Sequence, residues 1–257
     1  MFVRSVGERK AVGALLKAGH ADSAVARATG IPRSTVREWR INPWPRSKGE
    51  GDGRRRDGRQ RPCPVCTPDA SVLPEAEYAY LLGLYLGDGH ISPAPRTFRL
   101  RFFLDAAYPG IVAACGDALE VIRPGQTAWM QRSKSCRCIV VVMYSCHWPC
   151  LFPQHGPGRK HERPIELVSW QAELVSRRRT DFIRGLIHSD GCRIVANDRG
   201  LRSVRYHFSN RSEDIKRLYC DSLDALGIRW TRPCDKQIAV YRKASVAILE
   251  EFVGPKR

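Results

Sequence analysis

The sequence predicts a small all-α domain followed by a larger α+β domain that contains two copies of one unit. Apolar residues at helical spacing near the start predict the small domain. Later segments match each other in the same order, and each copy is predicted as helix, two strands, helix, two strands and helix. The boundaries drawn from these patterns are 1–41 for the small domain, 42–73 for a basic linker, 74–168 for the first copy and 169–257 for the second.

The composition points to an anionic partner. The 257 residues include 43 Lys and Arg against 26 Asp and Glu, which gives a formal net charge of +17. Such a charge creates a long-range positive potential that attracts polyanions, so nucleic acid is the first partner to test. The sequence has no apolar run of the roughly 18 to 20 residues that a bilayer span needs, and its start lacks a signal-peptide core. We therefore expect a cytoplasmic, nucleoid-associated protein with no membrane partner.

The small domain has the pattern of a helix-turn-helix. Asp22 is placed to cap its second helix, Gly30 allows the sharp turn after that helix, and Pro32 stands at the start of the third. Three groups of apolar residues at helical spacing indicate three short helices, and these groups are Val12, Leu15 and Leu16; Val25 and Ala26; and Val36 and Trp39.

The start of the third helix is the portion that contacts base edges in helix-turn-helix proteins. The segment GIPRSTVREW resembles helices of resolvase-like and other homeodomain-like binding modules. Short trihelical modules also serve as protein contacts, and that alternative stays open. The DNA-binding residues predicted in this helix are Arg33, Ser34, Thr35 and Arg37.

The linker predicted over 42–73 is rich in Pro, Gly and Arg, a composition that cannot bury a core. Its arginines would add salt-dependent phosphate contacts, although such a run is usually only solvated. In this chain we expect thiols or a metal rather than disulfides. Cys63 and Cys66 have the spacing of half a zinc site, but no second C-x2-C follows. We expect no zinc there unless the fold brings a further pair beside the linker, the candidates being Cys136 and Cys138, or Cys146, His147 and Cys150.

The larger domain repeats itself at a nearly constant offset of about 104 residues. LLGLYLGDG, which begins at Leu81, matches IRGLIHSDG, which begins at Ile183. The alternating strand FRLRF matches VRYHF, and a helix follows each strand. Near the end of each copy, a Gly-Pro pair is followed by a lysine, which is Lys160 in the first copy and Lys256 in the second.

The first helix of each copy carries small residues four apart, which permits close packing of the two helices. Asp88 and Asp190 follow at the helix ends, where the helix dipole disfavours a carboxylate. Two such carboxylates brought together repel each other and favour a bound cation, and oxygen ligands suit Mg²⁺. A site of this kind activates water in phosphodiester hydrolysis. The alternative is that each Asp-Gly is an ordinary turn.

LLGLYLGDG and IRGLIHSDG resemble the two signature helices of the LAGLIDADG homing endonucleases in their single-chain form. The resemblance implies a pseudo-twofold αββαββα pair with saddle-shaped antiparallel sheets that grip DNA. It further implies that Asp88 and Asp190 bind metal, with the carbonyls of Gly87 and Ser189 as further ligands. The sixth motif position, usually acidic, is Leu86 in one copy and His188 in the other. Lys160 and Lys256 resemble the basic residues of the family's active sites, the alternative being solvated terminal lysines.

The matched strands predict two basic sheet faces. Period-two alternation directs the apolar residues of each strand to one face and the basic residues to the other. Arginine in a major groove can bind guanine, although basic residues more often contact phosphate, and an ordinary solvated face is the alternative. The predicted base-reading residues are Arg99, Arg101, Arg205 and His207.

These observations favour a monomeric DNA-binding protein that cuts double-stranded DNA with Mg²⁺, with Asp88, Asp190, Lys160 and Lys256 as catalytic residues. Two motifs in one chain remove the need for a homodimer. The chief alternative is a sequence-specific transcription regulator that keeps the fold without cleavage. A third hypothesis is an RNA-binding intron maturase, because folds of this family also serve in that role.

Overall fold

The computed structural model describes residues 6–41, 63, 65–66, 73–133, 137–198, 200–253 and 256. The chain divides into two compact units, Met1–Asp57 and Gly58–Arg257. Most of the segment predicted as a linker, 42–73, lies outside the described residues. Within the described part of the chain, no helix combines the length and apolar character needed to cross a membrane.

The described residues of the first unit, 6–41, form three helices, α1 (Val6–Lys17), α2 (Asp22–Thr29) and α3 (Arg33–Ile41). Val12, Val25, Ile31, Val36 and Trp39 form its buried core. Gly30 ends α2 with a φ of 66°, the left-handed conformation that glycine adopts without strain. The expected cap by Asp22 is wrong. Ala21 occupies the cap position, and the Asp22 carboxylate instead binds Arg40 of α3 at 2.6 Å.

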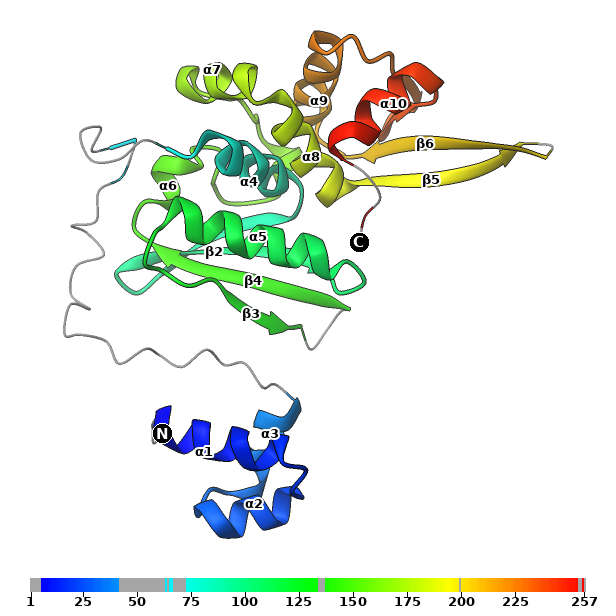
Figure 1. Ribbon diagram of the computed structural model, residues 1–257. Helices are drawn as coiled ribbons and strands as arrows, with labels where there is room; N and C mark the ends of the chain where they lie inside the picture. Colours follow the sequence, from blue (N-terminus) through cyan, green and yellow to red (C-terminus); the bar gives the residue numbers. More distant parts are fainter. Residues whose placement is uncertain are drawn as a thin grey trace. The chain divides into compact units, whose positions relative to one another are not determined.

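The second unit has the predicted α+β architecture of two αββαββα copies (Figure 1). The first copy comprises α4 (Glu75–Asp88), β1 (Gly89–Ala94), β2 (Thr97–Asp105), α5 (Pro109–Ile122), β3 (Trp129–Arg132), β4 (Cys138–Ser145) and α6 (Trp148–Leu151). The second comprises α8 (Arg179–Asp190), β5 (Gly191–Asp198), β6 (Leu201–Ser209), α9 (Glu213–Ala225), β7 (Thr231–Cys234), β8 (Gln237–Val240) and α10 (Lys243–Phe252). A short 3-10 helix (Lys160–Glu162) and α7 (Ser169–Arg177) connect them.

Each copy forms one antiparallel four-stranded sheet, in the order β1-β2-β4-β3 or β5-β6-β8-β7. The two sheets therefore have the same topology, as a duplication requires. Leu100 pairs with Met143 in the first sheet, and Tyr206 pairs with Val240 in the second. These residues are buried on the helix-facing side, so the apolar half of the predicted strand alternation is confirmed.

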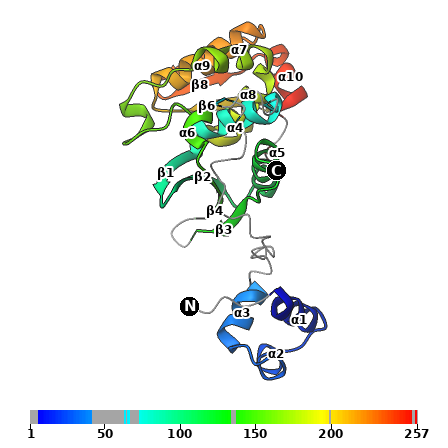
Figure 2. The ribbon, with the colours of Figure 1, turned by 90° about the vertical axis from the view of Figure 1, so that its left-hand side faces the viewer.

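The two copies meet where α4 packs against α8 (Figures 1 and 2). Gly83 and Gly185 lie at this contact. A Cβ added to Gly83 would collide with the carbonyl oxygen of Phe182, and one added to Gly185 with the carbonyl oxygen of Tyr80. Because these neighbours are backbone atoms, only glycine permits the observed helix approach.

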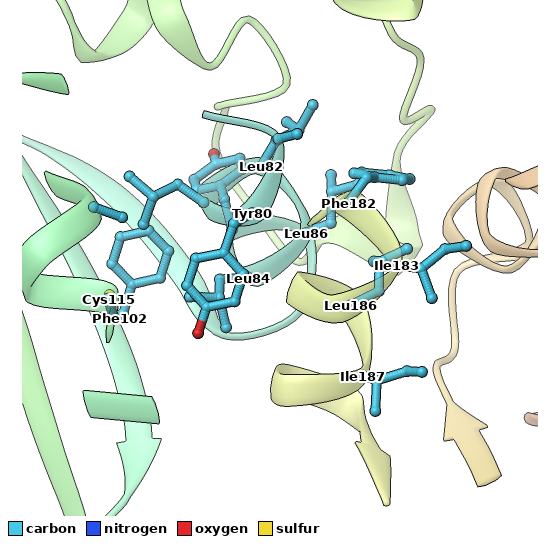
Figure 3. Packing of buried hydrophobic residues seen from close by; sticks show 14 of the residues in the cluster. Tyr80, Leu82, Leu84, Leu86, Phe102, Cys115, Phe182, Ile183, Leu186 and Ile187 are labelled. Carbon is cyan, nitrogen blue, oxygen red and sulfur yellow. The ribbon is translucent and has the colours of Figure 1, made fainter. Parts of the chain in front are cut away.

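One apolar core surrounds the helix pair. Figure 3 shows Phe102 and Cys115 of the first copy beside α4, and Ile183 and Ile187 on the side of α8 that faces away from α4. All four side chains are buried. The helix pair is thus packed from both sides, which fixes the position of the residues at its ends.

Candidate functional site

Asp88 and Asp190 are the last residues of α4 and α8, and the structure brings these two helix ends together. A Cβ added to Gly87 would contact the side chain of Ser189 and come within 2.9 Å of Asp190 Oδ2. The small residues of both motifs therefore allow the carboxylates to emerge side by side.

Burial dominates the electrostatics of this carboxylate pair. Burial, together with the neighbouring charge of Asp190, raises the pKa of Asp88 to about 7, although Lys160 and Lys256 act in the opposite direction. Burial also raises the pKa of Asp190, but a hydrogen bond from Asn210 Nδ2 at 2.6 Å favours its charged form. The pair therefore holds its negative charge at a cost, as a cation-binding site does.

Lys160 and Lys256 occupy matching positions at the two helix ends. Lys160 Nζ donates to the carbonyl oxygens of Gly87 at 3.0 Å and Gly89 at 2.7 Å, and also to that of Tyr85. Burial lowers the pKa of Lys160 to about 8 and lowers that of Lys256 as well. Neither lysine is a freely solvated terminal residue.

Lys256 Nζ makes the corresponding bonds in the second copy, to the carbonyl oxygens of His188 at 2.9 Å and Ser189 at 3.4 Å. Helix C-termini leave carbonyl groups without intrahelical partners, and a cation there complements the helix dipole. The two lysines thus satisfy the ends of α4 and α8 while facing the carboxylates.

The two halves of the site differ at one position that sequence inspection missed. Phe102 pairs with Gly89 in the first copy and Phe208 pairs with Gly191 in the second, so Leu104 and Asn210, each two residues further along, are structural equivalents. The amide of Asn210 reaches Asp190, whereas Leu104 is a buried apolar residue that offers no such donor to Asp88.

A pocket of about 510 Å³ opens beside Asp88. Residues from both copies line it, so it lies where the copies meet. The polar residues in its lining are Asp88, Asp105, Tyr108, Arg137, His188, Ser189 and Lys256.

The sixth motif position supplies no additional acid in either copy. Leu86 is buried in the core. His188 Nδ1 lies 3.0 Å from the hydroxyl of Tyr80, and burial together with Arg184 lowers the pKa of His188 to about 4. His188 is therefore neutral at physiological pH.

The open face of the first sheet carries Arg99 and Arg101, and the same face exposes aromatic side chains. Arg99 pairs with Tyr144, and Arg101 pairs with Val142, which is in turn opposite Trp129. The sequence analysis missed Tyr144 and Trp129. The alternation of side chains along the two strands that carry them could have placed both on the open face.

The second sheet presents Arg205 and His207 on its open face, beside Tyr241. The guanidinium of Arg205 lies 5.3 Å from the centre of the Tyr241 ring, and the His207 ring centre is 5.8 Å from it. The two faces thus differ in their side chains although their strands match.

In the first unit, the predicted contact residues lie at the start of α3. Arg33, Ser34 and Arg37 are exposed and Thr35 is partly exposed, whereas Val36 is buried. This arrangement leaves the basic face of α3 accessible.

Cys63, Cys66, His147 and Cys150 form a second cluster, distinct from the carboxylates. Their ligand atoms all lie within 4.8 Å of one another. We expected no zinc because Cys63 and Cys66 lacked a second pair of ligands. The fold supplies such a pair, His147 and Cys150, so this reason no longer holds. The three cysteines of the cluster form no disulfide bond, whereas Cys138, contrary to expectation, is disulfide-bonded.

The sequence matches no family profile, and no curated protein matches it. Among solved structures, full-length DUF199/WhiA from Thermatoga maritima is similar over 71% of this chain, with 14% identity and a TM-score of 0.45. The match spans 56% of that protein, little more than half its length.

The N-terminal LAGLIDADG domain of DUF199/WhiA is similar over 75% of this chain and 87% of that domain, with 16% identity and a TM-score of 0.46. The LAGLIDADG meganuclease I-AabMI bound to uncleaved DNA is similar over 68% of this chain and 82% of that one, with 10% identity and a TM-score of 0.43. Since likeness of fold does not transfer a function, the side chains of this chain must decide it.

Proposed function

We propose that this chain binds double-stranded DNA and hydrolyses its phosphodiester bonds with divalent cations held at Asp88 and Asp190. The observation that carries the proposal is the convergence of two partly buried helix-end carboxylates, with Lys160 and Lys256 close enough to lower the pKa of both. Asp88 and Lys256 line a pocket at this point. Duplex DNA has two strands to cut, and the duplicated fold offers one carboxylate for each.

The carboxylates and the neighbouring backbone carbonyls fit Mg²⁺ because their donor atoms are oxygens. The carboxylates would be the principal ligands, with the carbonyls of Gly87 and Ser189 beside them. Both carbonyls accept hydrogen bonds from lysine, but a carbonyl oxygen has a second lone pair for a cation. Bound Mg²⁺ would supply polarisation of the phosphate and a lowered pKa of water.

The chain's own residues would position the substrate. Lys160 and Lys256 are cations beside the carboxylates and would donate hydrogen bonds to phosphate oxygens as charge develops. The basic faces with Arg99, Arg101, Arg205 and His207 would follow the groove, and the exposed residues of α3 would add a second contact region. DNA binding through these surfaces does not require cleavage.

A non-cleaving DNA-binding regulator is the second candidate, and the lysine contacts favour it. The ammonium groups of Lys160 and Lys256 balance the two carboxylates, so the cluster carries no net charge without a metal. The absence of an acid at Leu86 and His188 agrees with this alternative.

The test is incubation of the full chain with DNA libraries that include its own locus, in Mg²⁺ or in EDTA. The nuclease proposal expects double-strand breaks that need Mg²⁺ and disappear in Asp88→Asn and Asp190→Asn. Asp105→Asn is the matched control, because Asp105 is an exposed carboxylate in the same pocket.

Tight DNA binding with every strand left intact would favour the regulator. Competition by structured RNA at matched salt would reveal whether an RNA is preferred, which would overturn both DNA proposals.

A further inference from the structure

Two short segments that are far apart in the sequence bring three thiols and one imidazole together. Cys63 and Cys66 precede α4, and His147 and Cys150 lie at the start of α6. Within the described residues, this is the one group of at least three His, Cys, Asp or Glu side chains found with metal-binding spacing.

The distances within the cluster suit a tetrahedral zinc ion. With Zn–S bonds of about 2.3 Å and Zn–N bonds of about 2.0 Å, ligand atoms at tetrahedral corners lie about 3.5–3.8 Å apart. His147 Nδ1 is 3.3 Å from Cys66 Sγ, and all ligand atoms lie within 4.8 Å of one another. Two ligand atoms 4.8 Å apart would reach this spacing if each moved by about half an ångström.

Local structure prepares the His147 and Cys150 ligands. His147 occupies the position before the first residue of α6, and its carbonyl oxygen accepts from Cys150 N at 3.1 Å. This turn places residues three apart on one side. Ser145 Oγ accepts from His147 N at 3.1 Å, and Trp148 Nε1 donates to Met143 O at 3.0 Å, so the turn is anchored to β4.

The other pair comes from a second turn. Val65 and Cys66 form a turn after Cys63, and Val65 packs against the main core. Cys63 is fully buried, whereas Cys66 is exposed, so the cluster lies at the surface of the second unit with one ligand accessible to solvent. An ion can therefore enter without unfolding the chain.

The corresponding positions of the second copy carry no metal-binding side chains. Aligned by the pairs Leu100–Met143 and Tyr206–Val240, His147 and Cys150 correspond to Ala244 and Ala247. The helix that carries these alanines, α10, has 10 residues, whereas α6 has four. The first copy thus ends in a helix too short to be stabilised by its own hydrogen bonds.

We propose that Cys63, Cys66, His147 and Cys150 bind one structural zinc ion, which fastens the segment before α4 to the short helix α6. Four protein ligands leave no open position for substrate, so the site is structural rather than catalytic. It would fix the point at which the chain arriving from the first unit joins the second.

Metal analysis of the full chain tests the proposal without any variant. Protein purified without added metal, or stripped and titrated, should hold an equimolar amount of zinc. Cobalt in place of zinc should give the intense visible bands of a tetrahedral thiolate site, and X-ray absorption should find three sulfur ligands and one nitrogen. A protein that takes up neither metal, or one whose cluster cysteines are joined by a disulfide, would overturn the proposal.

Variants then assign the ligands. Cys66→Ser should disturb the fold least, because the Cys66 side chain is exposed. Cys66→Ser and Cys150→Ser, each made as a single variant, should both abolish zinc binding. Cys146→Ser is the matched control. Cys146 adjoins His147 but contacts the Arg96 carbonyl instead of the cluster. Equal zinc content in Cys66→Ser and Cys146→Ser, with both folded by circular dichroism, would refute the assignment.

Discussion

Asp88 and Asp190 are carboxylates held largely out of water at helix C-termini, where the helix dipole also disfavours negative charge. Burial is the largest cause of the raised pKa of Asp88, with Asp190 second. Lys160 and Lys256 lower the pKa of Asp88 and so offset part of the cost of burying its charge. The ionisation of each residue in the cluster therefore depends on the others.

Asp88→Asn should flatten the pH dependence of stability when EDTA keeps cations away. The pKa of an unfolded Asp is about 4, whereas the pKa of Asp88 in the folded protein is about 7. Between these values the native state binds the extra proton, so wild-type stability falls as the pH rises, by at most about 1.4 kcal/mol per pH unit. Urea denaturation across this window measures the slope, and equal slopes in the two proteins would contradict the burial of Asp88.

At the scale of elements, α4 and α8 decide how the two copies fit together. Their contact depends on glycine because backbone atoms of one helix face backbone atoms of the other. Substitution at this contact therefore tests whether the copies fold as one body.

Gly185→Ala should lower the free energy of unfolding by about 1–3 kcal/mol, because the new Cβ meets the fixed carbonyl of Tyr80. Gly116→Ala in α5 is the control. Its Cβ would collide only with the end of the flexible Met130 side chain and would make an ordinary contact with Ala128 Cβ, so stability should hold or rise by up to about 1 kcal/mol. Equal losses in the two variants, measured by chemical denaturation, would disprove close helix packing as the cause.

Helix-end aspartates and strand alternation were predictable because both follow local periods in the sequence. Leu100 and Phe102 face the core, as the pattern FRLRF predicts. The metal cluster was not predictable in this way, since Cys66 and His147 are separated by 81 residues and meet only through the tertiary fold. The contact from Asn210 to Asp190 also depends on tertiary structure, and the Asp22 cap failed because Arg40 of another helix binds its carboxylate.

At the scale of the whole molecule, a net charge of +17 predicts DNA affinity that falls steeply with salt. Both the net charge of the protein and the positions of individual arginines on its surface contribute to DNA affinity. The two contributions can be separated by comparing an arginine on the open sheet face with an arginine on the helical layer, because both carry the same charge.

Arg101→Ala should weaken duplex binding more than Arg217→Ala, although each removes one positive charge. Arg101 lies on the open face of the first sheet, whereas Arg217 lies on α9, paired with Asp214 at 2.9 Å. Loss of a phosphate contact should reduce the salt slope by about 0.9, and loss of a base contact should cost about 1–3 kcal/mol. Fluorescence anisotropy at several salt concentrations measures both, and equal effects would show that only total charge matters.

Unequal surroundings for the two carboxylates impose an order on the proposed reaction. Asn210 donates a hydrogen bond to Asp190, whereas leucine stands at the corresponding position of the first copy. The two strands of a duplex would then be severed at different rates, and supercoiled plasmid would pass through an open-circular form before it became linear. The two halves of the duplicated unit are similar in fold, and the difference between their side chains would make them kinetically distinguishable.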